Sequence, residues 1–234
     1  MVGRCPDAAV RVPLNLQQWH LVTFLHWRVE AALLQPMLPQ RLVVDEIDGS
    51  AWIGVTPFVM RRVRVPGSPL PVVRDFVEVN VRTYVQGPDG RDGIWFFSLE
   101  CSRLPVVAAL RTIGLPYVRA RTAVRTPGRS LVEYVSRRQR GGGELLVRAR
   151  PGAPLPEPDA LVNALTGRWN AYTERWGRLW LVPVEHEPWP LLEAQAQVDV
   201  GPLLAANGLP TPDAAPLVHH APVVHVRVGA PRPA

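Results

Sequence analysis

The chain has 234 residues, of which 47% are hydrophobic and 20% are charged, a balance typical of a folded soluble protein. Its formal net charge is +6, and all 26 basic residues are arginine because the chain contains no lysine. This composition excludes every mechanism that needs a lysine amine. It also argues against nucleic acid as a partner. A phosphate-binding surface can use lysine as freely as arginine, so the absence of lysine indicates a codon bias of the genome rather than selection for a DNA-binding face.

The N-terminal residues, "MVGRCPDAAVRVPLN", are interrupted by Arg4, Asp7 and Arg11, so they lack the apolar core of a signal peptide. No uninterrupted apolar run is long enough to cross a bilayer. We therefore expect a cytoplasmic protein with no membrane partner. The two cysteines, Cys5 and Cys101, lack the C-x-x-C spacing of a zinc or redox site, so we expect two reduced thiols.

The first predicted elements are a helix and a hairpin. Four apolar residues recur at helical spacing within residues 26–38, namely Trp27, Ala31, Leu34 and Leu38. They predict a helix that Pro39 ends. Residues 41–65 then predict a hairpin with Asp48 and Gly49 in its turn.

Later segments predict an antiparallel meander. The expected strands are residues 74–85, 94–102, 115–126, 130–140, 141–150, 177–189 and 221–228. Residues 104–114 carry a single charge and predict a short helix that is buried on most sides. Residues 151–158 resemble a linker, and a second helix is expected after Asp159, which can serve as its N-cap.

Many antiparallel strands with a few short helices indicate an α+β fold, mostly antiparallel β, built around a curled sheet or barrel. We expect a single domain over residues 1–234. Its ends, residues 1–15 and 228–234, are expected to be flexible.

The stretch "RDFVEVNVRTYV", residues 74–85, alternates so regularly that both faces of the strand can be assigned. One face carries valines, and the other carries Glu78, Asn80, Arg82 and Tyr84. If the valines match Trp95, Phe97 and Leu99 of the return strand, the register adds three residues to the polar row: Phe96, Ser98 and Glu100. This row is either a solvated surface with ion pairs or the lining of a barrel that holds one small ligand.

Seven segments carry a family resemblance: "FLHWRV", "DGSAWIGVTPFVM", "RDFVEVNVRTYV", "GIWFFSLE", "IGLPYVRA", "LTGRW" and "VEHEPWPL". Their order resembles the YqjF-like family of uncharacterised bacterial proteins, a branch that is similar to the acetoacetate decarboxylase fold. The resemblance implies a mostly antiparallel structure with a central cone-shaped barrel around a pocket. It also implies a homo-oligomer.

The same resemblance bears on the chemistry. In the decarboxylase relatives, lysines that follow a Gly-x-Pro turn form and activate a Schiff base. That turn resembles Gly114–Pro116, which is followed here by Tyr117 and Val118, so Schiff-base decarboxylation is excluded. The relatives also keep a pocket glutamate in an aromatic-x-Glu element that is similar to Phe76–Glu78, which favours the interior reading of the polar row.

These observations lead to a hypothesis of a cytoplasmic pocket protein for a small carbonyl or carboxylate metabolite. Glu78 would be the general acid or base, Arg82 would hold a carboxylate, and Tyr117 would donate a hydrogen bond to a carbonyl. The expected ligand-binding residues are Asn80, Tyr84, Phe96, Ser98 and Glu100. If the protein is an enzyme, we expect lyase-like or hydrolase-like chemistry without a lysine nucleophile and without a cofactor.

Other functions stay open. Strand alternation puts Glu185 and Glu187 on one face of "VEHEPW" and His186 on the other, so no metal site is expected there. An arginine-rich surface could instead serve a non-enzymatic interaction or nucleic-acid-binding module. A third alternative is a structural oligomer whose vestigial pocket is filled by Trp and Phe side chains.

Overall fold

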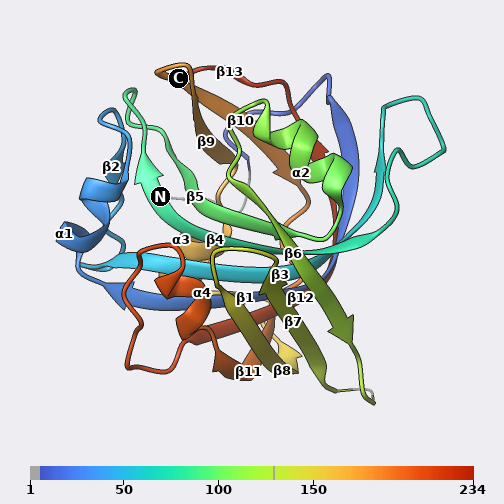
Figure 1. Ribbon diagram of the computed structural model, residues 1–234, viewed down its shortest axis with the longest axis vertical. Coiled ribbons are helices and arrows are strands. Elements are labelled where there is room, and N and C mark those ends of the chain that lie inside the picture. The colour runs from blue at the N-terminus through green and yellow to red at the C-terminus, as the bar shows by residue number, and fades with distance from the viewer. Residues whose placement is uncertain (1–5, 129) are drawn as a thin grey trace.

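The computed structural model describes residues 6–128 and 130–234, and in this part of the chain 13 strands form one sheet (Figure 1). The strands are β1 (Asn15–Val29), β2 (Val43–Val44), β3 (Ala51–Arg64), β4 (Phe76–Gln86), β5 (Asp92–Cys101), β6 (Tyr117–Arg125), β7 (Val132–Arg138), β8 (Glu144–Pro154), β9 (Asn170–Arg175), β10 (Arg178–His186), β11 (Leu192–Asp199), β12 (Leu217–Val228) and β13 (Arg232–Pro233). The helices are α1 (Ala31–Leu34), the 3-10 helix η1 (Gln35–Met37), α2 (Leu104–Arg111), α3 (Ala160–Thr166) and α4 (Gly201–Ala205). The predicted architecture of mostly antiparallel strands with a few short helices is confirmed.

The sheet closes on itself because β4 pairs with β5 and β12 pairs with β10. The first ring runs β4, β5, β9, β10, β12, β1 and β3. A second, longer route joins β5 to β12 through β6, β7, β8 and β11. Strands β1, β3 and β4 belong to both rings, so they form a wall between two interiors, with β9, β10 and α2 on one side and β7, β8 and α4 on the other (Figure 1).

This shared wall explains why both faces of β4 are buried. All residues from Phe76 to Val85 are buried, as are those from Ala51 to Met60 in β3. Strands with near-continuous burial are typical of sheets that are covered on both sides. On the valine face, Val79 and Val81 pack in the main core with Tyr134 and Val147 from the second ring. The polar face of β4 therefore points into the first ring rather than to solvent.

The predicted register of the central hairpin is wrong from Phe97 onward. Val81 lies opposite Ser98, but its neighbour Arg82 lies opposite Phe96, so Phe97 is an extra residue in β5. Such a bulge shifts the alternation by one residue, and every side chain beyond it changes face. Ser98 therefore shares a face with the valines.

The prediction of a helix over residues 26–38 is wrong for its first part. Residues up to Val29 belong to β1, where Trp27 lies opposite Ile53 of β3. The Asp48-Gly49 turn does form, with positive φ angles of 52° and 69° and an isolated bridge that joins the residues on either side. The predicted hairpin around it does not form, because β2 pairs with β4 and β3 pairs with β1 and β4.

Three further expectations change. Only Val107 is buried in α2, although a helix buried on most sides was expected. The expected linker begins inside β8, whose last residues pair with β11. Strands β9 and β11 were not predicted, because β9 follows α3 after a short connection and β11 contains no fully buried residue, its alternate residues being only half-buried. Asp159 is the N-cap of α3 as predicted, since its carboxylate accepts a hydrogen bond from the Val162 amide at 2.8 Å.

The described ends of the chain contact the sheet. The Val10 amide donates to Glu185 of β10 at 2.6 Å, and β13 pairs with β10 through Arg232 and Pro233. Cys5 lies outside the described residues. Cys101 is a free, buried cysteine, and burial raises the pKa of its thiol to about 12. Among the described residues, no helix is both long and apolar enough to span a membrane.

Candidate functional site

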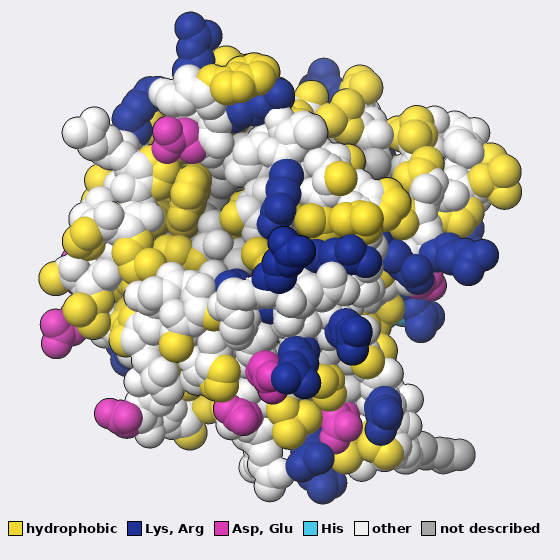
Figure 2. Space-filling model, in the orientation of Figure 1, with side chains coloured by type: hydrophobic (Ala, Val, Ile, Leu, Met, Phe, Trp, Pro, Cys, Tyr) yellow, Lys and Arg dark blue, Asp and Glu magenta, His cyan; other side chains and the backbone are white. Residues whose placement is uncertain are grey.

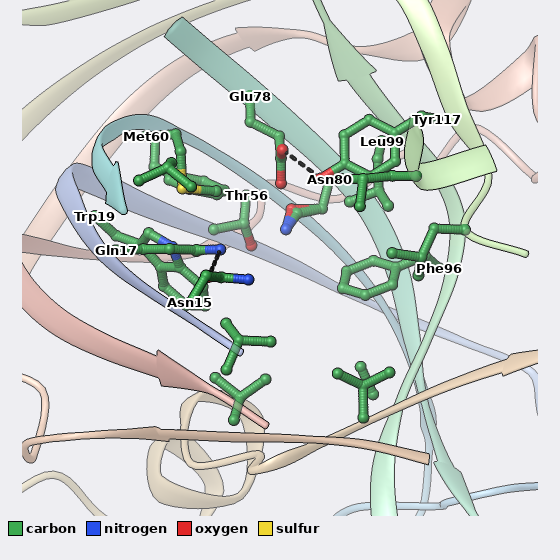
Figure 3. A pocket seen from close by; sticks show the side chains of 18 of the residues that line it. Asn15, Gln17, Trp19, Thr56, Met60, Glu78, Asn80, Phe96, Leu99 and Tyr117 are labelled. Atoms are coloured by element: carbon green, nitrogen blue, oxygen red, sulfur yellow. Dashed lines mark hydrogen bonds between the residues drawn. The ribbon is translucent and has the colours of Figure 1, made fainter. Parts of the chain in front are cut away.

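A cavity of about 530 Å³ lies inside the first ring, against the polar face of β4. Five residues singled out from the sequence line it: Glu78, Asn80, Arg82, Phe96 and Tyr117. Figure 3 shows Glu78 and Asn80 from one strand facing the cavity, with Phe96 and Tyr117 along one side. All three residues of the expected acid-base and carboxylate group, Glu78, Arg82 and Tyr117, thus line the same cavity.

Glu78 and Tyr117 form a buried pair. The Tyr117 hydroxyl donates a hydrogen bond to Glu78 Oε2 at 2.8 Å (Figure 3). Burial raises the pKa of Glu78 to about 7, although this hydrogen bond acts in the opposite direction. Burial and the nearby Glu78 charge raise the pKa of Tyr117 well above its usual value. The phenol therefore stays protonated and acts as a hydrogen-bond donor to Glu78. Glu78 itself can exchange a proton near neutral pH.

Two orphaned polar atoms lie beside this pair. Thr56 of β3 lies directly opposite Asn80 of β4 in the antiparallel register. Thr56 Oγ1 and Asn80 Oδ1 are buried and have no hydrogen-bond partner among the described residues. Buried polar atoms are nearly always paired, because an unpaired one costs about 1–3 kcal/mol. Both residues line the cavity and point into it (Figure 3), so a ligand is the natural partner for these atoms.

Arg82 is a buried cation that makes no ion pair within the described part of the chain. The residue is 8% exposed, and its Nε has no hydrogen-bond partner there. The guanidinium lies over the rings of Phe24 and Tyr84, at 5.6 Å and 5.9 Å from their centroids. Gly54 lies opposite Arg82 in β3, and a Cβ atom at Gly54 would stand 3.2 Å from Arg82 Cγ. The lack of a side chain at Gly54 thus leaves room for the arginine.

A second arginine in the cavity wall shows the contrast. Arg168 Nη1 contacts Asp45 at 2.6 Å and Asp92 at 2.9 Å. Its charge is therefore balanced by two carboxylates, whereas that of Arg82 is left for another partner.

Three of the predicted ligand-binding residues do not line the cavity. The Tyr84 hydroxyl donates to the Leu165 carbonyl at 2.9 Å, which fixes its ring beside Arg82. Ser98 and Glu100 lie on the opposite face of the wall, beyond the bulge at Phe97. There Glu100 Oε1 accepts hydrogen bonds from Ser98 at 2.9 Å and from Arg138 at 3.0 and 2.8 Å. This is an internal ion pair, separate from the cavity.

An aromatic wall was missed from the sequence. Trp189 stacks on Trp19 with ring centroids 6.2 Å apart and meets the edge of Phe24 at 4.9 Å. Trp19 also lies 5.2 Å from Phe58, and all four residues line the cavity. Trp19 and Phe24 lie in β1, Phe58 lies in β3, and Trp189 lies between β10 and β11, so no local pattern groups all four. The one available signal is that Trp19 continues an alternating polar series in β1: its Nε1 donates to Gln17 Oε1, and Gln17 Nε2 donates to Asn15 Oδ1 (Figure 3).

The residues of "VEHEPW" separate as alternation predicts. His186 lines the cavity, and burial lowers its pKa to about 4, so the ring is neutral. Glu185 contacts Arg227, whereas Glu187 pairs with His225 at 2.9 Å. The described residues hold no group of three or more His, Cys, Asp or Glu side chains that could bind a metal ion.

Comparison with known proteins gives the family. The DUF2071 model, described as an uncharacterized conserved protein, matches residues 16–225. The chain belongs to the DUF2071 family. The chain is also similar to the uncharacterized protein YqjF of Bacillus subtilis (strain 168). The two are 36% identical over 230 residues, and the alignment covers 94% of each. The resemblance to the YqjF-like family is therefore confirmed.

Solved structures give the fold of this DUF2071 chain. An acetoacetate decarboxylase-like enzyme from Sphingomonas wittichii RW1 matches with a TM-score of 0.70 and 15% identity, over 97% of this chain and 95% of that one. The enduracididine biosynthesis enzyme MppR, complexed with pyruvate, matches with a TM-score of 0.67 and 15% identity, over 97% and 93%. The acetoacetate decarboxylase of Legionella pneumophila matches with a TM-score of 0.66 and 11% identity, over 97% and 92%. At these identities the likeness establishes the acetoacetate decarboxylase-like fold alone.

Proposed function

We propose that this protein binds a small carboxylate in the cavity, with Arg82 as the partner of the anion. The observation that carries the proposal is a buried guanidinium that has no carboxylate partner among the described residues. An uncompensated buried charge costs several kcal/mol, and a bound carboxylate would offset that cost through paired hydrogen bonds. The structure of MppR with pyruvate supports the proposal, because that protein holds a keto acid on the same fold.

We propose further that Glu78 exchanges a proton with the bound molecule. Its pKa of about 7 allows both protonation states near neutral pH, which suits a general acid or base. Thr56 Oγ1 can donate a hydrogen bond to a carbonyl oxygen of the ligand, and Asn80 Oδ1 can accept one from a hydroxyl group of the ligand. Tyr117 follows the Gly-x-Pro turn, where the decarboxylase relatives have lysines, so it would hold Glu78 rather than attack a carbonyl.

The test is a titration of keto acids, hydroxy acids and aromatic acids by calorimetry and thermal shift. We expect Arg82→Ala to weaken carboxylate binding at least tenfold, in line with the loss of charged hydrogen bonds worth about 1.5–3 kcal/mol. Glu78→Gln should remove the pH dependence of binding near pH 7. Undiminished binding in Arg82→Ala together with an unchanged pH dependence in Glu78→Gln would contradict the assignment.

A matched control is available on the same hairpin. Glu100→Gln also removes a buried carboxylate, but from the opposite face of the wall, next to Arg138. It should change stability and leave ligand affinity unchanged. A change in the pH dependence of binding in Glu100→Gln equal to that in Glu78→Gln would mean that the variants act through general destabilisation.

The alternatives differ in what supports them. Figure 2 shows arginines scattered over one face with acidic side chains among them, and on β6 the exposed Arg119, Arg121 and Arg125 share one face. Binding of nucleic acid would appear as a steep loss of affinity with added salt. A vestigial pocket would be filled by Trp and Phe side chains, but here these line an open cavity of about 530 Å³. The cytoplasmic location and the homo-oligomer stay predictions.

A further inference from the structure

The cavity is larger than a short keto acid needs. Its volume of about 530 Å³ has room for roughly 18 water-sized groups at about 30 Å³ each. Most lining residues are apolar, including Met60, Phe76, Ile94 and Leu99. A small polar acid would leave this apolar surface in contact with water, so size and polarity both favour a ligand with a large apolar part.

The two charged positions are far apart along β4. Arg82 and Glu78 are four residues apart on one face, which places their backbones about 13–14 Å apart at roughly 3.4 Å per residue. The Arg82 guanidinium turns toward Phe24 and Tyr84, and it is not among the groups that shift the pKa of Glu78. In acetoacetate a single methylene separates the carboxylate from the ketone. A ligand that contacts both positions must therefore be much longer.

The aromatic wall runs alongside this row. Phe24 lies at the Arg82 end, because the guanidinium stands over its ring. Phe58 lies at the other end, directly opposite Glu78 in the register, and Trp19 packs against it. Trp189 contacts both Phe24 and Trp19, so it joins the two ends. The cavity thus has one polar edge and one continuous aromatic side.

We infer that the ligand is an elongated monocarboxylic acid with an aromatic or extended apolar body, held by its carboxylate at Arg82. Its body would lie along the wall formed by Phe24, Trp189 and Trp19 and reach Glu78. The inference rests on the proposed carboxylate site, and it adds the size and the chemical class of the ligand. The cavity reaches the surface beside α2, where the lining residues Pro105 and Ala109 are exposed.

The test uses a series of phenylalkanoates, from phenylacetate to 6-phenylhexanoate, with acetate, acetoacetate and the matching phenylalkanols as comparisons. Binding is measured by calorimetry and by quenching of tryptophan fluorescence, because two tryptophans line the cavity. Affinity should rise up to about fourfold per added methylene, the value expected for full burial of each group. The alcohols should bind at least tenfold more weakly than the acids, and Arg82→Ala should remove that difference.

A pair of neighbouring variants on α2 tests the position of the body. Ala109→Phe adds a ring to the cavity, whereas Ala108→Phe adds the same ring at an exposed position that does not line it. We expect the first variant to weaken 6-phenylhexanoate at least tenfold with acetate binding unchanged, and the second to change neither. Equal loss in both variants would overturn the placement.

Two other results separate the inference from the proposed function. If acetate and acetoacetate bind as tightly as 6-phenylhexanoate, and Arg82→Ala abolishes all three, the inference fails and the carboxylate site stands. If alcohols and acids bind equally in the wild type, the carboxylate site itself fails, and the inference fails with it.

Discussion

Replacement of Glu78 by glutamine should change how the stability of the protein depends on pH. The pKa of Glu78 is about 7 in the folded protein, against 4.5 for an ordinary glutamate. Between these values the folded state binds the proton more tightly than the unfolded state, so the free energy of unfolding falls as the pH rises. The rise from 4.5 to about 7 corresponds to about 3 kcal/mol, which is lost as the pH rises from about 4.5 through about 7. Glutamine does not ionise, so Glu78→Gln escapes this loss.

The assay is urea unfolding of both proteins across this pH range, followed by tryptophan fluorescence. The difference in stability between Glu78→Gln and the wild type should move by about 3 kcal/mol in favour of the variant as the pH rises. Histidines that titrate in the same range are common to both proteins and cancel. Tyr117→Phe removes the hydrogen bond that lowers the pKa of Glu78, so its midpoint should lie at a higher pH. Parallel profiles for the wild type and Glu78→Gln would refute the reasoning.

Three further predictions concern other buried residues. Arg138→Met leaves Glu100 buried without its ion pair and should cost about 3–5 kcal/mol in urea unfolding, with the affinity for cavity ligands unchanged. Gly54→Val crowds Arg82 and should weaken carboxylate binding, measured by calorimetry, about tenfold or more. Unchanged affinity would mean that the Arg82 side chain can reach the ligand in another conformation. Burial lowers the pKa of His220 to about 4, so the wild type loses stability as the pH falls below about 6.5. His220→Asn should therefore show a shallower loss of Tm between about pH 6.5 and about pH 4, and an identical profile would contradict this.

Much of the strand pattern could be predicted from the sequence. Alternation over residues 74–85, the turn after them and the return strand correspond to β4 and β5. The helix predicted at residues 26–38 failed over residues 26–29, because helical spacing and strand alternation coincide over a short apolar run. Pairing of β1 with β3 and β12 decided between them.

The sequence by itself determined the composition of the site: one strand that carries a carboxylate, an amide and an arginine on a single face, in a chain without lysine. It could not decide whether that face is exposed to solvent, because the alternation of side chains is the same for a surface strand and for a strand that is buried on both faces. The tertiary structure decided this by closing two rings that share β1, β3 and β4.

The bulge at Phe97 could not be predicted from the sequence either. Nothing in "GIWFFSLE" marks which residue is left unpaired, yet that one residue moves Glu100 from the cavity to the opposite face. The reason is physical: side chains in a strand repeat every two residues, so a single insertion reverses every face beyond it. Local sequence fixes which residues alternate, and only the pairing of distant strands fixes which side of the wall each one occupies.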